Sequence, residues 1–307
     1  MIKIAIIGNG NHSKRIQKIL IKKKFKFIIY KPDNKKYYDK EKFEIVKKCN
    51  VIFIISPHNT HYYYINKLKE KRYIYCEKPP VSSLRQLKNL SKFSCNKIYF
   101  NFNKRFSAVG KIFDGIKKYN LGELVYANII SSHGLALKNE YKYNWRSKFN
   151  KCRKGVFEIV SIHDLDLINY FYTVKKIYKP TLVNLSKVGT SFDTSFLRLQ
   201  LKNNAMVDIF STYSSSFLDE WTILFKNGII KKTNNGLVIR KPTKTFDKKG
   251  LFVLPKIKYK INISSKKDYK ESLLKSVSFF LKCAKNKKKL SKHLFKTSIN
   301  SNFLLLN

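Results

Sequence analysis

A glycine-rich turn directly follows the first apolar segment of the chain. Residues 2–7 are almost continuously apolar, as expected of a strand that is buried on both faces. The turn has the pattern G-x-G-x-x-S and consists of Gly8, Asn9, Gly10, Asn11, His12 and Ser13. In a dinucleotide-binding turn the first glycine allows the tight bend, the second lets the backbone approach a pyrophosphate, and the third position needs only a small residue. We therefore expect the amides at the start of the next helix to bind a pyrophosphate, the alternative being an ordinary glycine-containing turn.

The end of the second predicted strand bears on the choice of cofactor. An acidic residue at this place would hold the ribose hydroxyls of NAD. The sequence has Tyr30-Lys31-Pro32-Asp33 instead. A lysine would neutralise the 2′-phosphate of NADP, so Lys31 gives a slight preference for NADP, although lysine is common throughout the chain.

Two later turns also carry polar side chains after predicted strands. One has the sequence Ser56-Pro57-His58-Asn59-Thr60-His61, and the other has Cys76-Glu77-Lys78-Pro79-Pro80. The proline after Lys78 stiffens the turn at the carboxyl end of its strand, which is the edge where open α/β sheets bind ligands. His58 and His61 form an H-x-x-H pair, but no cysteine or third histidine lies nearby to complete a zinc site. We expect no metal.

The order of these motifs resembles the glucose-fructose oxidoreductase and inositol 2-dehydrogenase family, often called Gfo/Idh/MocA. In that family a T/S-P-x-x-x-H turn precedes an E-K-P turn. The resemblance continues at Asn103-Lys104-Arg105-Phe106, Gly122, Trp145-Arg146, residues 155–163 and Asp268-Tyr269. Each piece is modest by itself, but the ordered set covers nearly the whole chain.

The resemblance implies roles for individual residues. Lys78 would position the substrate hydroxyl or carbonyl beside the nicotinamide, and Glu77 would contact the cofactor. The wall around the nicotinamide would include Ser56, Pro57 and His61. Substrate contacts are expected from Asn103, Arg105, Trp145 and Arg146, because polar and planar cationic groups suit hydroxyls, carboxylates and phosphates, although these side chains could equally lie at a domain interface.

A predicted helix at residues 155–172 matches the family pattern only in part. Family members carry D-x-G-x-H, with the aspartate and histidine one helical turn apart. His163 matches, but the aspartate position holds Ile159 and the nearest carboxylate is Glu158, one residue too early. At about 100° per residue, Glu158 lies off the face of His163 on a regular helix. A π-bulge would bring it back to that face.

His163 is the best candidate for the general acid and base, because the ordinary pKa of histidine is near neutrality. The carboxylates of Asp164 and Asp166 are expected to cap the helix or to form ion pairs. The residues predicted to be catalytic are therefore Lys78 and His163.

The elements that must position these residues follow two patterns. Up to about residue 121, short apolar strands alternate with amphipathic helices, which is typical of a parallel sheet. From about residue 123 the strands are longer and alternate in polarity, which indicates an antiparallel sheet with one covered face. The strands are predicted at 2–7, 25–30, 51–55, 73–76, 98–102, 125–131, 195–201, 206–212 and 221–225, and the other helices at 13–23, 62–71 and 268–285.

We therefore predict an α/β Rossmann domain that binds NAD(P) at residues 1–121. An α+β domain with a large, mostly antiparallel sheet follows at 122–307 and would bind substrate and form oligomer contacts. Its final helix is expected to pack back toward the Rossmann domain. A chain of 307 residues has room for both cores.

The formal charge of +45 would attract nucleic acid or an anionic membrane surface. The lysines are spread along the whole chain, however, and the abundance of Lys, Asn, Ile, Phe and Tyr is typical of an AT-rich genome. We expect no nucleic acid and no membrane partner. The charge does favour small anionic ligands, including phosphorylated cofactors and nucleotide-linked sugars.

Two further features bear on the compartment. No apolar run is long enough to cross a bilayer, and the first predicted strand leaves no room for a signal peptide, so we expect a cytoplasmic protein. The cysteines are odd in number and widely spaced, which predicts reduced thiols without a disulfide: Cys49, Cys76, Cys95, Cys152 and Cys283.

The sequence thus predicts an NAD(P)-dependent oxidoreductase that transfers a hydride to or from a sugar, nucleotide sugar or cyclitol. Family members are homo-oligomers, and we expect the same here. The main alternative is a cofactor-binding protein that has lost catalysis, because the aspartate is missing. A second alternative, a nucleic-acid-binding protein, is supported only by the net charge.

Overall fold

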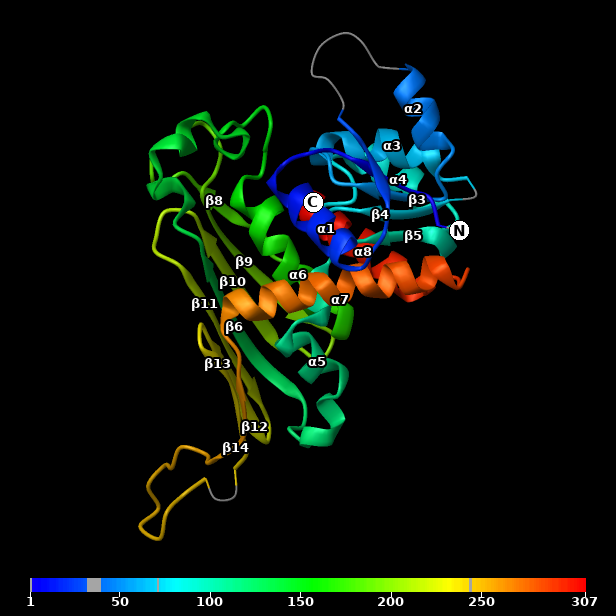
Figure 1. Cartoon of the computed structure of the whole chain (residues 1–307). Coiled ribbons are helices and arrows are strands. Elements are labelled where there is room, and N and C mark those ends of the chain that lie inside the picture. Colours follow the sequence, from blue (N-terminus) through cyan, green and yellow to red (C-terminus); the bar gives the residue numbers. More distant parts are fainter. Residues whose placement is uncertain (1, 32–39, 71, 243–244) are drawn as a thin grey trace. The chain divides into compact units, whose positions relative to one another are not determined.

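Short apolar runs form a five-stranded parallel sheet in the N-terminal part of the chain (Figure 1). The strands lie in the order β2-β1-β3-β4-β5 and are β1 (Ile4–Ile7), β2 (Phe27–Tyr30), β3 (Val51–Ile54), β4 (Tyr73–Cys76) and β5 (Ile98–Phe100). All of them except β2 are buried at every residue, as strands covered on both faces should be. Because β1 lies between β2 and β3, the chain reverses its direction across the sheet there. Ligands bind at the carboxyl ends of strands at such a switch point.

This computed structural model describes residues 2–31, 40–70, 72–242 and 245–307. Its contacts divide the chain into two units, one of Met1–Asn103 with Leu273–Asn307 and one of Lys104–Ser272. Some predictions fall on residues outside these ranges: residue 1 of the predicted first domain, residue 71 of the predicted helix 62–71, and Pro32 and Asp33 of the motif after the second strand. Within the described ranges, no helix has both the length and the apolarity to cross a bilayer.

The division falls after Asn103 and not at 121/122 as predicted. Helix α5 (Ala108–Asp114) packs on helix α6 (Ile162–Phe171), where the Phe113 ring lies 5.5 Å from the rings of both Phe171 and Tyr172. These aromatic contacts place the segment after residue 103 in the second unit. The chain leaves that unit inside helix α7 (Ser265–Lys285).

The helices of the first unit are α1 (Asn11–Lys22), α2 (Lys40–Lys47), α3 (His61–Leu68), α4 (Leu84–Leu90) and α8 (Lys292–Leu306), together with the second part of α7. Helix α8 packs on α4 and β5 but was not predicted. Its buried face is largely polar and includes Thr297, Ser298, Ser301 and Asn302. The Asn302 side chain accepts a hydrogen bond from Val81 N at 2.8 Å. A polar buried face leaves no apolar periodicity in the sequence.

The second unit contains a nine-stranded sheet with the order β14-β13-β12-β11-β6-β10-β9-β7, and β8 also pairs with β9. Every neighbouring pair is antiparallel except β6 and β10, which confirms the predicted sheet type. The strands are β6 (Leu124–Ser132), β7 (Val174–Ile177), β8 (Thr181–Val183), β9 (Thr194–Leu201), β10 (Met206–Thr212), β11 (Leu218–Phe225), β12 (Gly228–Thr233), β13 (Gly236–Arg240) and β14 (Ile257–Asn262).

Residues 155–172 begin with a π-helical segment, Phe157–Ser161, before α6 starts at Ile162. The backbone N–H of Ile162 donates to the oxygen of Phe157, five residues earlier. Gly155 precedes the segment with a φ of +55°, and a Cβ there would lie 1.8 Å from the oxygen of Phe192. Only glycine fits this position. The π-helical segment packs on β9 and β10.

Candidate active site

The two glycines of the glycine turn differ in the space around them. Gly8 has a φ of +106°, and a Cβ there would lie 2.3 Å from the oxygen of Ile55. Ser13 is buried, and its hydroxyl donates to the oxygen of Gly8 at 2.8 Å, which closes the turn. A Cβ on Gly10 would meet no atom within 4 Å. The turn is therefore tight at its first glycine and open at its second, beside the N-terminal amides of α1.

Other predicted cofactor contacts lie in or near this turn. Asn9 and Asn11 are exposed, and Asn9 Oδ1 accepts a hydrogen bond from Gln17 at 3.1 Å. Lys31 is exposed and directly follows β2, whose last residue, Tyr30, is buried. Lys31 is thus placed at the carboxyl end of β2, as the sequence predicts.

The turn after β3 is held together by side chains. The hydroxyls of Ser56 and Thr60 are 2.6 Å apart, and Thr60 also donates to the oxygen of Pro57 at 2.7 Å. His61 is 1% exposed, with Nδ1 2.8 Å from the oxygen of Pro79 and Nε2 3.0 Å from the oxygen of Ser56. Burial lowers the pKa of His61, so a neutral ring donates to one of these two carbonyls. His61 therefore lies within hydrogen-bond distance of both the turn after β3 and the turn after β4.

Glu77, in the turn after β4, has two hydrogen-bond partners at one carboxylate oxygen. It is 8% exposed, and its Oε1 lies 2.7 Å from both His12 Nε2 and Asn101 Nδ2. Burial pushes the pKa of Glu77 up, but His12, Asn101 and Lys78 outweigh it, so the pKa is lowered and the carboxylate is ionised. Asn101 was not predicted, although a polar residue directly after β5 at the same sheet edge is a signal for it.

Lys78 is half-buried and precedes Pro79 through a cis peptide bond. Cys76 is fully buried, and burial raises the pKa of its thiol well above the usual value. The Cys76 thiol is therefore an inert part of the core. The motif thus offers one ionised carboxylate and one amine at the carboxyl edge of the sheet.

In the second unit, Arg105 forms a bidentate ion pair with Asp166. Its Nε donates to Oδ2 at 2.8 Å and its Nη2 to Oδ1 at 2.6 Å. Both residues are buried, and the guanidinium lies 4.5 Å from the ring centre of Tyr170. This geometry lets Arg105 hold α6 through Asp166, and its contact with substrate stays a prediction.

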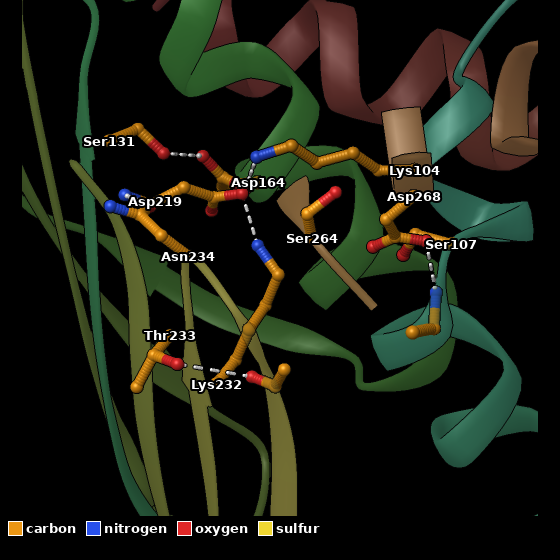
Figure 2. A network of polar contacts seen from close by, with 12 residues as sticks. Lys104, Ser107, Ser131, Asp164, Asp219, Lys232, Thr233, Asn234, Ser264 and Asp268 are labelled. Carbon is orange, nitrogen blue, oxygen red and sulfur yellow. Dashed lines mark hydrogen bonds and ion pairs between the residues drawn. The ribbon is translucent and has the colours of Figure 1, made fainter. Parts of the chain in front are cut away.

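Asp164 belongs to a buried network of charged groups (Figure 2). It forms an ion pair with Lys104 and accepts a hydrogen bond from Ser131 at 3.2 Å. Burial raises the pKa of Asp164 by more than Lys104 lowers it. Burial would lower the pKa of Lys104, but Asp164 and Asp219 raise it further, so Lys104 stays charged.

Two neighbouring groups extend this network (Figure 2). Asp219 forms an ion pair with Lys232, and its backbone N–H donates to Asn234 Oδ1 at 2.9 Å. Asp268, in the first turn of α7, accepts a hydrogen bond from Ala108 N at 2.8 Å. The network thus fixes α6, which carries His163, to the sheet and to residues 104–108.

His163 lies half-buried in the first turn of α6. Glu158 is buried in the π-helical segment, and its Oε1 accepts a hydrogen bond from Lys154 N at 3.1 Å. In a π-helix, hydrogen bonds join residues five apart, and Glu158 and His163 are five apart. Ile159 packs instead against the apolar cluster of Ala136, Tyr141, Val156, Val160 and Tyr213. Glu158 therefore lies inside the π-helical segment, and His163 lies two residues beyond its end.

The remaining predicted substrate contacts lie in short turns. Trp145 and Arg146 are half-buried, and the Arg146 guanidinium lies 4.4 Å from the ring centre of Trp145. Arg146 N also donates to Asn144 Oδ1 at 3.0 Å, which caps the turn. Asn103 is buried and ends the first segment of the first unit. Among the described residues, no group of three or more His, Cys, Asp or Glu side chains could hold a metal ion.

No protein-family model and no curated protein sequence matches this chain. Solved structures match it over 99% of its length. An oxidoreductase from Thermotoga maritima has 15% identity and a TM-score of 0.77 over 95% of that chain. A dehydrogenase from Clostridium difficile has 21% identity and a TM-score of 0.68 over 97% of that chain. A levoglucosan dehydrogenase bound to NADH and levoglucosan has 14% identity and a TM-score of 0.75 over 96% of that chain.

These matches show that the chain shares the fold of these three proteins. The predicted fold, a Rossmann domain joined to an α+β domain with a large sheet, is confirmed.

Proposed function

We propose that this chain is an NAD(P)-dependent oxidoreductase that acts on a hydroxyl or carbonyl group of a sugar, nucleotide sugar or cyclitol. One observation carries the proposal. The open glycine turn, the ionised Glu77 and the half-buried Lys78 all lie at the carboxyl edge of one parallel sheet. The structural match to a dehydrogenase that holds NADH and a sugar supports it.

The first unit fits a dinucleotide. Gly8, Gly10 and the first amides of α1 would hold the pyrophosphate, because a Cβ at Gly10 would fill space that is open. Lys31 would neutralise a 2′-phosphate, which favours NADP slightly over NAD. When bound, the nicotinamide ring supplies or accepts the hydride.

The remaining roles belong to the chain's own side chains. Lys78 binds the substrate oxygen and stabilises the negative charge that develops on it. His163 is the proposed general acid and base that gives or takes the proton of the reaction. Glu158 stabilises the protonated form of His163 through its carboxylate.

The substrate is an anionic sugar. A groove of about 330 Å³ in the second unit is lined by Ala136, Leu137, Lys138, Asn139, Lys142 and Val188. Ala136 belongs to the apolar cluster that contains Val160 of the π-helical segment, and Val188 packs against that cluster. The ammonium groups of Lys138 and Lys142 and the stacked Trp145–Arg146 pair suit a phosphate or carboxylate on the substrate.

The test combines cofactor binding with a substrate screen. NADH and NADPH binding would be followed by fluorescence, and turnover of neutral sugars, sugar acids and nucleotide sugars by the absorbance of the cofactor. We expect Lys78→Met and His163→Asn to lower kcat at least about 100-fold while cofactor affinity stays unchanged. Lys88→Met and His293→Asn, on the surface of other helices, are the matched controls.

Each alternative gives a different result. A chain that binds neither NADH nor NADPH would contradict the proposal at its first step. Tight cofactor binding without turnover of any substrate class would favour the protein that has lost catalysis. A clear preference for NADH would contradict the role given to Lys31.

A further inference from the structure

A chain of hydrogen bonds in the first unit leads from the start of α1 to α7. His12 and Asn101 each lie 2.7 Å from Glu77 Oε1. Ser276 Oγ donates to Asn101 Oδ1 at 2.7 Å, and the Tyr99 hydroxyl lies 2.8 Å from Ser276 Oγ. All five side chains belong to the same unit. In the His12–Glu77 pair, the His12 side chain is the more exposed one, at 33%.

The ionised carboxylate of Glu77 determines the direction of every bond in this chain. Because a carboxylate only accepts, His12 Nε2 and Asn101 Nδ2 must both carry the hydrogen. The amide oxygen of Asn101 must then face Ser276, and the Ser276 hydroxyl donates its hydrogen to that oxygen. Tyr99 is left as the donor to Ser276. Each donor therefore has one possible acceptor, and no member can reverse without breaking the bond to its neighbour.

Burial makes this arrangement stable. Ser276 is fully buried, Asn101 is 1% exposed and Tyr99 is 2% exposed. Water cannot replace a lost partner at such sites without cost, and a buried polar group without a partner is unfavourable. The second carboxylate oxygen of Glu77, Oε2, has no hydrogen bond to any residue that the structure describes. The hydrogen-bond chain thus holds Glu77 through Oε1.

We propose that Asn101, Ser276 and Tyr99 are positioning residues for the cofactor site. Through Glu77 they fix the His12 ring in the second position of α1, with its Nε2 hydrogen directed at the carboxylate. The imidazole is thereby oriented beside the amides that would bind the pyrophosphate. The expected effect on cofactor binding rests on the proposed function, whereas the orientation of the His12 ring does not.

The test uses two variants and two matched controls in the full chain. Ser276→Ala and Tyr99→Phe each remove one hydroxyl of the hydrogen-bond chain. Ser278→Ala removes a hydroxyl on the same helix that only donates to Leu274 O, at 2.6 Å. Tyr73→Phe removes a hydroxyl on the neighbouring strand β4 that donates to Lys288 O, at 3.1 Å. The controls match the variants in residue type and leave the bonds to Glu77 intact.

Two measurements separate positioning from simple structural support. The first is the imidazole nitrogen signals of His12 in NMR spectra of the chain without cofactor. We expect them to shift in Ser276→Ala and Tyr99→Phe and to stay unchanged in both controls. The second is the dissociation constant for NADPH, which we expect to rise about three- to tenfold in the two variants and less than twofold in the controls.

Unchanged His12 signals in both variants would overturn the inference, and so would equal effects of variants and controls on NADPH affinity. If the wild-type chain binds no NADPH, the proposed function fails, and the His12 signals still decide the positioning role. If Ser276→Ala does not fold, Tyr99→Phe carries the same test, since it leaves the Ser276 hydroxyl in place.

Discussion

Glu158 and His163 lie five residues apart on either side of the change from π-helix to α-helix. At about 100° per residue, residues five apart in a regular α-helix differ by about 140° around its axis. The wider π-helical turn reduces this difference, because it adds one residue to the turn. The carboxylate of Glu158 is therefore closer in angle to His163 than the spacing of a regular α-helix would place it.

We predict that Glu158→Gln lowers kcat about 10- to 100-fold and leaves NADPH affinity unchanged, because it removes the charge that stabilises protonated His163. Steady-state kinetics with a substrate found in the screen would measure this. Ile159→Val is the control, and we expect it to retain nearly full kcat because Ile159 packs in the apolar cluster. A Glu158→Gln variant with the wild-type kcat would show that the carboxylate serves only the Lys154 amide.

A related prediction concerns Arg105. Arg105→Met should lower the free energy of unfolding by about 3–5 kcal/mol, because it leaves Asp166 charged and buried without its partner. Arg105→Lys should recover only part of this loss, since an ammonium cannot make the bidentate pair. Urea denaturation gives the measurement. Arg198→Met, at a pair with Asp208 in which the arginine side chain is 49% exposed, is the control and should have a smaller effect.

Two buried carboxyls should give opposite dependences of stability on pH. Burial raises the pKa of Asp164 above its ordinary value of 3.8, so its contribution to stability declines as pH rises from 3.8 through the raised pKa. Although burial pushes the pKa of Glu77 upward, His12 and Asn101 lower it below 4.5, so its contribution is lost as pH falls below 4.5.

The differences in unfolding free energy between wild type and the variants Asp164→Asn and Glu77→Gln should therefore change with pH in opposite directions. Above pH 3.8 the wild type should lose stability relative to Asp164→Asn, and below pH 4.5 it should lose stability relative to Glu77→Gln. Urea titrations at several pH values measure both differences. The same slope for both variants would contradict the assigned directions.

The sequence predicted those parts of the fold and the site that follow from local patterns. The bounds of β4 and β10 agree with the predicted 73–76 and 206–212, because their residues are uniformly or regularly buried. The glycine turn was found because Gly8 needs a positive φ that few other residues adopt. The positions of Lys78 and His163 followed from motif order.

Tertiary contacts explain what the sequence did not predict. The buried face of α8 is mostly polar, and the strand β14 is exposed at nearly every residue, so neither shows an apolar period. Asn101 and Ser276 lie 175 residues apart and meet only in the folded chain. A π-bulge was raised from the sequence only because Glu158 stands one residue from the family position, and the close approach of Gly155 to Phe192 before that segment is not visible in the spacing within the helix.

The final prediction compares two glycines whose surroundings differ in this structure. Gly10 has a φ of −75° and open space where a Cβ would lie, so Gly10→Ala should keep the wild-type melting temperature. The new methyl group would occupy the place proposed for the pyrophosphate, and we expect NADPH affinity to fall at least about tenfold.

Gly155→Ala should behave in the opposite way. Its φ of +55° and the 1.8 Å approach to Phe192 O leave no room for a methyl group, so we expect a loss of about 3 kcal/mol or more in the free energy of unfolding. Thermal unfolding and fluorescence titration of both variants make the comparison. Gly10→Ala changes only the space above the turn. Wild-type NADPH affinity in that variant would therefore show that the pyrophosphate does not bind at this turn. The proposed cofactor site would then lose its main support.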